Sequence, residues 1–89
     1  MRKGYGIRVT GKVQNVGFRY YTVKTAAEFN ICGFVTYKPD GSVYIEAEGE
    51  EDMLEGFLSW CRRGPQWARV EGFEVQEQPV MGFEGFKVR

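Results

Sequence analysis

The stretch "KVQNVGFRYY", residues 12–21, joins two segments with different hydrophobic periods. Before it, residues 5–13 alternate between apolar and polar side chains, which is typical of a half-buried strand. After it, residues 20–29 have helical spacing, and the expected apolar stripe consists of Val23, Ala26 and Ala27. The stretch therefore predicts a turn that leads from a strand into a helix.

The rest of the chain supplies the other elements of an α+β domain. A hairpin is predicted from strands at residues 33–38 and 43–48, because "PDGS" between them favours a tight turn. The second helix follows, starting in an acidic segment and ending with Arg62 and Arg63 before Gly64. Two further strands are predicted at about residues 68–76, with a bulge near Gly72, and 84–88.

The predicted order is β-α-β-β-α-β-β. Two βαβ units of this kind combine most simply into a ferredoxin-like sandwich, an antiparallel sheet with both helices packed on one face. With 89 residues, of which 43% are hydrophobic, the chain is long enough for one domain, residues 1–89.

Composition narrows the possible partners. Twelve basic and twelve acidic side chains give a net charge of zero, which argues against a nucleic acid or an anionic membrane as the partner. No apolar run is long enough to span a bilayer, and the N-terminus lacks the pattern of a signal peptide. We therefore expect a soluble, cytoplasmic protein, and a monomer.

Cysteine and acidic residues have structural interpretations. The sequence has two cysteines, Cys32 and Cys61, and no histidine, so the usual ligand sets for zinc are absent. We expect reduced, core-facing thiols, a disulfide being the alternative in an oxidising compartment. The acidic run is interpreted as a solvated strand face plus the charged start of a helix, and it consists of Glu46, Glu48, Glu50, Glu51 and Asp52.

The junction itself is a candidate anion site. Residues 14–19 contribute consecutive backbone N–H groups at the start of a helix, and Gly17 allows a sharp turn. The helix N-terminus favours negative charge, and the Arg19 guanidinium can bind two phosphate oxygens at once. The alternative is an ordinary strand-to-helix turn followed by a solvated arginine, because a single glycine is a weak signal.

The same residues carry a family resemblance. "GKVQNVGFR", residues 11–19, resembles the acylphosphatase signature G-x-V-Q-G-V-G-F-R. Downstream, "GFVTYKPDGSV" at residues 33–43 is similar to the family's G-W-V-x-N-x-x-D-G-x-V segment. "GPQWARVEGFEV" and the closing "FKVR" also resemble family segments, in the family's order and spacing.

The resemblance implies an enzyme that hydrolyses the carboxyl-phosphate bond of acyl phosphates. Arg19 matches the arginine that holds the phosphoryl group, and the matching phosphate-binding loop consists of Gln14, Asn15, Val16, Gly17, Phe18 and Arg19. In the family, water attacks phosphorus in line with the leaving carboxylate, with neither a metal nor a cofactor. The implied partner is a small acyl phosphate or inorganic phosphate.

Two positions depart from the family pattern. Asn15 replaces a glycine, and asparagine tolerates positive φ better than most residues. Tyr37 stands where the family has the catalytic asparagine that orients the attacking water. As a catalytic residue, Tyr37 could hold water through its hydroxyl, or its presence could reduce turnover.

Two other functions remain open from the sequence. A non-catalytic phosphate-binding or interaction domain could keep the loop and lack the water-orienting group. An RNA-binding module is the second, because "KGYGIRV" at residues 3–9 resembles half of the aromatic signature of the RNA-recognition motif. Tyr5 in that segment is interpreted as a partly buried strand residue.

Overall fold

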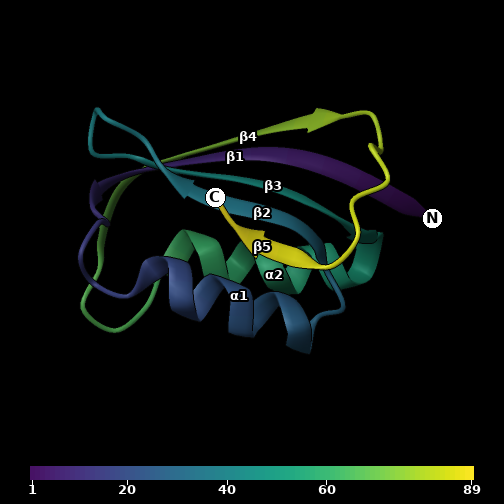
Figure 1. Ribbon diagram of the computed structural model, residues 1–89, viewed down its shortest axis with the longest axis horizontal. Coiled ribbons are helices and arrows are strands. Elements are labelled where there is room, and N and C mark those ends of the chain that lie inside the picture. The colour runs from purple at the N-terminus through teal and green to yellow at the C-terminus, as the bar shows by residue number, and fades with distance from the viewer.

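In the computed structural model, which describes residues 1–89, two helices cover one face of a five-stranded sheet (Figure 1). The elements are β1 (Arg2–Lys12), α1 (Phe18–Glu28), β2 (Cys32–Tyr37), β3 (Val43–Glu50), α2 (Glu51–Arg63), β4 (Arg69–Gln78) and β5 (Phe86–Val88). Neither helix has the length and apolar character needed to cross a membrane. The predicted β-α-β-β-α-β-β order is confirmed.

The strand order in the sheet is β4-β1-β3-β2-β5. Strand β1 pairs antiparallel with β3 and β4, and β2 pairs antiparallel with β3. The short β5 pairs parallel with β2, so the sheet is mixed and the prediction of a fully antiparallel sheet is wrong at this edge. The reason is that β4 ends at the same end of the sheet as that at which β2 begins (Figure 1). The chain therefore starts β5 from that end, and β5 runs in the same direction as β2.

The core lies between the sheet and the two helices. Its buried residues come from β1, β2, β3, both helices and the connections on either side of α1: Ile7, Val9, Val13, Phe18, Ala26, Ile31, Val35, Val43, Ile45, Ala47, Leu54, Phe57 and Cys61. The inward positions of β1 and β3 are those expected from the alternation. The predicted irregularity near Gly72 is also confirmed, because Thr10 pairs with Gly72 and Gly11 with Val70, which leaves Glu71 unpaired.

Helix α2 follows its sequence signals closely. Glu51 and Asp52 lie in its first turn, Arg62 and Arg63 in its last, and Gly64 caps it with a φ of 75°. This arrangement places charges favourably at both ends of the helix dipole. The helix therefore carries its own start and stop signals in addition to its buried apolar face.

The predicted apolar stripe of α1 is confirmed at Ala26, which is buried in the core, and is wrong at Ala27. The buried residues of α1 are Phe18, Thr22, Thr25 and Ala26, whereas Ala27 is exposed and Val23 is only half-buried. The fully buried Phe18 ring fixes the rotation of the helix about its axis. Thr22 can be buried because its hydroxyl donates a hydrogen bond to the Phe18 carbonyl at 2.6 Å.

Glu48 also corrects the sequence interpretation, because it does not lie on a solvated strand face. Its side chain is fully buried, and the segment between β4 and β5 covers it. The carboxylate accepts hydrogen bonds from the N–H groups of Met81, Gly82 and Phe83, the last two at 3.0 and 3.1 Å. Because its acceptors are used, Glu48 fastens this segment to the sheet.

The remaining structural expectations concern single side chains. Both cysteines are free, as predicted; Cys61 is buried and Cys32 half-buried. Burial raises the pKa of the Cys61 thiol above its usual range. Tyr5 packs partly buried against the core, as expected for a strand residue.

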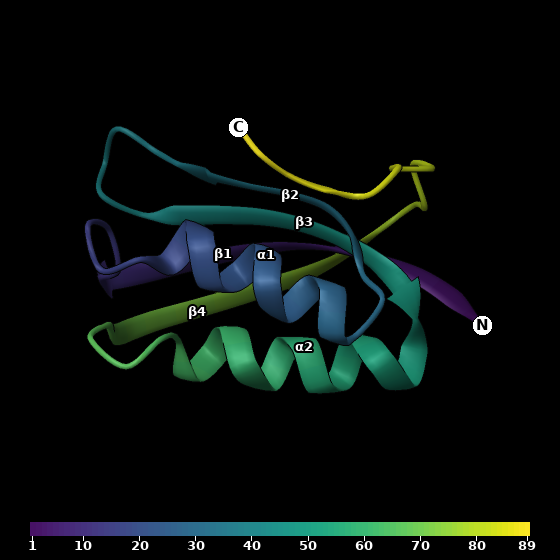
Figure 2. The ribbon, with the colours of Figure 1, turned by 60° about the horizontal axis from the view of Figure 1, so that its bottom comes forward.

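Three connections gather at one end of the sheet. Figures 1 and 2 show the β1–α1 connection, the β2–β3 turn and the α2–β4 connection on the left, opposite the N-terminus. In Figure 2 the two helices lie next to each other in front of the sheet, and α1 begins at this same end. The candidate anion loop therefore lies at the end of the molecule where the hairpin turn is found.

Candidate functional site

The β1–α1 loop turns through two residues with positive φ. Asn15 has a φ of 62° and Gly17 a φ of 78°. The expectation that Asn15 would tolerate the conformation of the family's glycine is thus confirmed, since asparagine is one of the few side chains that enter this region readily. A Cβ on Gly17 would lie 3.2 Å from the Tyr21 ring, so the site favours glycine for space as well as for φ.

The backbone N–H groups of this loop have no acceptors within the protein. The first hydrogen bond of α1 runs from the Tyr21 N–H to the Gly17 carbonyl at 3.0 Å. No residue from 14 to 20 is a donor in any backbone hydrogen bond of the loops or turns. No side chain caps α1, and no acidic residue lies in its first turn. The helix N-terminus is therefore an uncompensated positive end with free donors.

Arg19 lies in the first turn of α1 and is exposed. It belongs to none of the five ion pairs in the molecule. Instead its guanidinium carbon lies 3.9 Å from the centroid of the Tyr37 ring, within the range of a cation–π contact. The structure thus brings together the two side chains that the sequence proposed as catalytic.

Tyr37 is the last residue of β2 and packs half-buried against the core. It pairs with Val43 across the hairpin. Its position is therefore set by the sheet, whereas that of Arg19 is set by the helix.

Gln14 ties the loop to the hairpin. Its amide nitrogen donates hydrogen bonds to the carbonyl oxygens of Lys38 and Ser42, at 2.8 and 2.9 Å. The sequence placed Gln14 in the loop but did not indicate this role, because no local pattern relates it to a turn 24 residues further along the chain. The two hydrogen bonds hold the loop and the end of β2 in a fixed relation.

The six predicted loop residues contribute in different ways. The Phe18 side chain is fully buried and meets the Trp60 ring edge to face, with centroids 5.7 Å apart. Val16 packs against the core as well. These two residues can contribute only backbone N–H groups to an anion, and Arg19 is the member whose side chain can donate.

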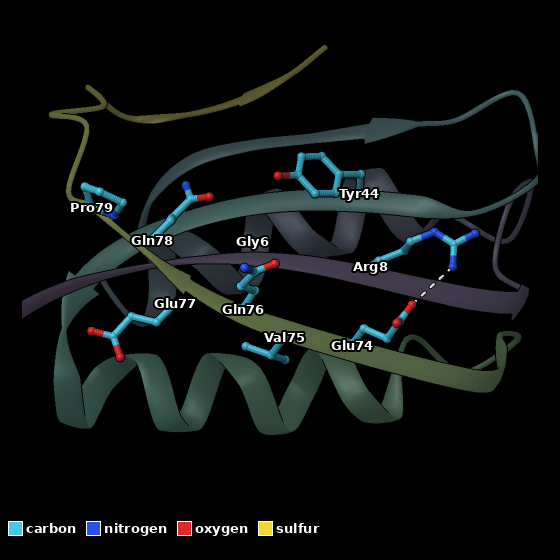
Figure 3. A pocket seen from close by; sticks show the side chains of 9 residues that line it. All are labelled: Gly6, Arg8, Tyr44, Glu74, Val75, Gln76, Glu77, Gln78 and Pro79. Carbon is cyan, nitrogen blue, oxygen red and sulfur yellow. Dashed lines mark hydrogen bonds and ion pairs between the residues drawn. The ribbon is translucent and has the colours of Figure 1, made fainter.

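A groove lies elsewhere on the protein, across β1, β3 and β4 on the sheet (Figure 3). It has a volume of about 700 Å³. Arg8 at its edge donates to Glu74 at 3.2 Å and to Asp40 at 2.8 Å. Tyr44 donates to Glu46 at 2.7 Å, and burial, aided by this hydrogen bond, raises the pKa of Tyr44 to about 12. Two charged side chains that line the groove, Arg8 and Glu74, are thus paired with each other, whereas Arg19 of the loop has no carboxylate partner.

The arrangement at the loop can bind a small oxyanion through backbone and side-chain donors together. Consecutive N–H groups at a helix N-terminus and a planar guanidinium are complementary to the oxygens of a phosphoryl group. No group of three or more cysteine, aspartate and glutamate side chains lies close enough together to hold a metal ion.

Comparison with known proteins gives a consistent result. The family model for acylphosphatase matches residues 5–88. The chain is 49% identical to an acylphosphatase of Archaeoglobus fulgidus over 82 residues, covering 92% of each chain. It is 42% identical to an acylphosphatase of Thermotoga maritima over 87 residues, covering 98% of this chain and 97% of that protein.

Solved structures agree with the sequence comparisons. The crystal structure of acylphosphatase from Bacillus subtilis superimposes with a TM-score of 0.94 at 34% identity, covering 100% of this chain and 99% of that one. An acylphosphatase structure from Coxiella burnetii gives the same TM-score at 33% identity, covering 99% and 93%. The predicted fold class and the resemblance are both confirmed.

Proposed function

This chain belongs to the acylphosphatase family, and on that premise we propose that residues 14–19 hold the phosphoryl group of an acyl phosphate. The activity is that of an acylphosphatase, and the non-catalytic alternative is not favoured by relatives that match the chain over nearly its whole length. The geometry of the loop supports the assignment of the phosphoryl site.

The observation that carries the proposal is a row of unpaired donors. The N–H groups from residue 14 to residue 20 lack backbone acceptors, and the Arg19 guanidinium has no carboxylate partner. Elsewhere in the protein, Arg8 is held by two carboxylates. Unpaired donors gathered in one loop are pre-organised for an anion, because binding requires no existing hydrogen bond to break.

In the proposed reaction a water oxygen attacks phosphorus while the bond between phosphorus and the carboxylate oxygen breaks. The products are a carboxylate, inorganic phosphate and the proton released from the attacking water. Positive charge from Arg19 and the loop N–H groups stabilises the equatorial phosphoryl oxygens in the transition state. The leaving carboxylate is weakly basic, so it departs without needing a proton from the protein.

The test is hydrolysis of acetyl phosphate by wild type, Arg19→Ala and the matched control Arg8→Ala. We expect Arg19→Ala to lower kcat/KM by roughly 100- to 1000-fold, as loss of a transition-state donor commonly does. Arg8→Ala should stay within roughly twofold of wild type, because that guanidinium serves the fold. Equal rates for wild type and Arg19→Ala would contradict the proposed site.

A further inference from the structure

We propose that Tyr37 is a positioning residue whose aromatic ring, and not its hydroxyl, sets the orientation of the Arg19 guanidinium. The inference rests on the function proposed above, since it assumes that Arg19 binds the phosphoryl group. It assigns to this position a contact with the arginine in place of a hydrogen bond to water.

The contact itself is the first observation. An exposed arginine at a helix start has many rotamers, and fixing one of them for ligand binding costs entropy. Arg19 has no ion pair that would select a rotamer, but its guanidinium carbon lies 3.9 Å from the centre of the Tyr37 ring. The ring is the partner that orders this side chain before any anion arrives.

The second observation is the rigidity of the support. Tyr37 ends a strand, pairs with Val43 and packs against the core. The Lys38 N–H donates to the Ser42 carbonyl at 2.9 Å, which closes the turn just after Tyr37. Gln14 then joins this turn to the anion loop. The ring is consequently held in a fixed position relative to the loop N–H groups.

A ring has an advantage over a carboxylate at this position. An acidic partner would occupy guanidinium N–H groups and neutralise the charge, as Asp40 and Glu74 do for Arg8. A ring contacts the face of the guanidinium and leaves its in-plane N–H groups free for oxygens of a ligand. Stacking thus orders Arg19 without reducing its capacity to bind an anion.

The hydroxyl of Tyr37 has no comparable role in the structure. Tyr44 is the tyrosine whose hydroxyl donates a hydrogen bond within the protein, at 2.7 Å from Glu46. No protein group fixes the direction of the Tyr37 O–H, so the fold orients the ring alone.

Two kinds of variant separate the ring from the hydroxyl. Tyr37→Phe keeps the ring and removes the O–H, whereas Tyr37→Leu and Tyr37→Ile remove the ring. Phe34→Leu is the matched control, because Phe34 lies in the same strand and carries Arg89 over its ring at 4.2 Å. For each variant we would measure KM and kcat with acetyl phosphate, the Kd of inorganic phosphate by calorimetry, and the midpoint of thermal unfolding.

We expect Tyr37→Phe and Phe34→Leu to keep KM, kcat and the phosphate Kd within roughly twofold of wild type. Both ring-removing variants should raise KM and the phosphate Kd roughly three- to tenfold, which is the range of a partly desolvated cation–π contact, with a smaller change in kcat. A kcat at least roughly tenfold lower in Tyr37→Phe would overturn the inference by making the hydroxyl the important group. Wild-type phosphate affinity in Tyr37→Leu and Tyr37→Ile would overturn it as well.

The same experiment separates this inference from the function on which it rests. If Arg19→Ala neither lowers turnover nor weakens phosphate binding, the proposed site is wrong and the positioning role fails with it. If Arg19→Ala is inactive while ring-keeping and ring-removing variants behave alike, the site stands and only the role of Tyr37 is refuted.

Discussion

Arg8 and Arg19 show two ways in which this fold treats the same side chain. Arg8, on the face of β1, donates to Asp40 at 2.8 Å and to Glu74 at 3.2 Å. Arg19, at the start of α1, has no carboxylate partner and lies against the Tyr37 ring. The first guanidinium uses its donors to join the β2–β3 turn to β4, and the second keeps its donors available.

The polar groups around the two arginines also differ in whether they have hydrogen-bond partners within the protein. Asp40 accepts hydrogen bonds from the Ser42 hydroxyl and N–H at 2.6 and 2.9 Å as well as from Arg8. Around Arg19, the loop N–H groups are unpaired and the helix N-terminus has no acidic neighbour. One region is internally neutralised, whereas the other is ready for an anion from solution.

The sharpest way to test this comparison is the same conservative change at both arginines. Arg19→Lys keeps the charge but loses the planar donors and the stacking face, so we expect kcat/KM for acetyl phosphate to fall about 100-fold. Arg8→Lys should change kcat/KM less than about twofold. Similar losses in the two variants would mean that the fold does not distinguish the arginines as described.

A second change deforms the loop without altering any charge. Gly17→Ala forces a side chain into a φ of 78° and places its Cβ 3.2 Å from the Tyr21 ring. We expect about 1–2 kcal/mol of lost stability from the left-handed backbone and roughly tenfold lower activity from displaced N–H groups.

The matched control for Gly17 is Gly82, which has a φ of 82° and no neighbouring atom within 4 Å of an added Cβ. Gly82→Ala should lose comparable stability in urea unfolding and keep wild-type kcat/KM. If both alanine variants lose activity equally, the effect belongs to general destabilisation and not to the anion loop.

A third change loosens the connection between the loop and the hairpin. Gln14→Ala removes two hydrogen bonds to the turn after β2. At about 1 kcal/mol for each, we expect a stability loss of about 1–2 kcal/mol, with roughly three- to fivefold weaker phosphate binding as the loop and Tyr37 move apart. Gln76→Ala, an exposed glutamine on β4, is the control and should leave both quantities unchanged.

The smallest predicted effect is a change in stability with pH that depends on Asp40, the partner of Arg8. Hydrogen bonds from the Ser42 hydroxyl and N–H, followed by the ion pair with Arg8, hold the pKa of Asp40 well below its usual value of 3.8. A depressed pKa means that the ionised carboxylate stabilises the folded state above pH 3.8, and that this contribution is lost as the pH falls through the lowered pKa.

Asp40→Asn should therefore be less stable than wild type at neutral pH, and the difference should shrink below pH 3.8. Thermal unfolding of both proteins as a function of pH measures this, with acetyl phosphate hydrolysis near neutral pH as the second measurement. Hydrolysis within about twofold of wild type is expected, because Asp40 contacts Arg8 and Ser42 and contacts neither Arg19 nor the loop N–H groups. A constant stability difference at all pH values would show that the carboxylate charge is not what matters.

Much of the fold was predictable because its signals are local. Helix α2 has acidic residues at its start, basic residues at its end and a glycine cap, all visible in the sequence. The positive φ of Asn15 was likewise predictable from its residue type. The buried face of α1 was not, because Thr22 is polar in any hydrophobicity pattern and is buried only once its hydroxyl finds the Phe18 carbonyl.

Interactions between distant segments set the limit of prediction. The alternation of β3 correctly predicts that Glu48 lies on the outer face of the strand. The sequence does not show that residues 81–83 cover this side chain. The proposed anion loop, residues 14–19, is continuous in the chain, so the sequence alone can predict it as a candidate site. Two contacts at the site depend on tertiary packing and cannot be predicted from a local pattern. They are the contact of Arg19 with the Tyr37 ring and the hydrogen bonds from Gln14 to the hairpin turn.

The central claim is that the loop N–H groups and Arg19 close around a phosphoryl group. A titration of the ¹⁵N-labelled protein with inorganic phosphate, followed by amide NMR, tests this most directly. The amides of residues 14–20 should shift saturably in wild type and in Arg8→Ala, and should not shift in Arg19→Ala. Shifts confined to the groove beside Arg8, with the amides of residues 14–20 unmoved, would contradict it.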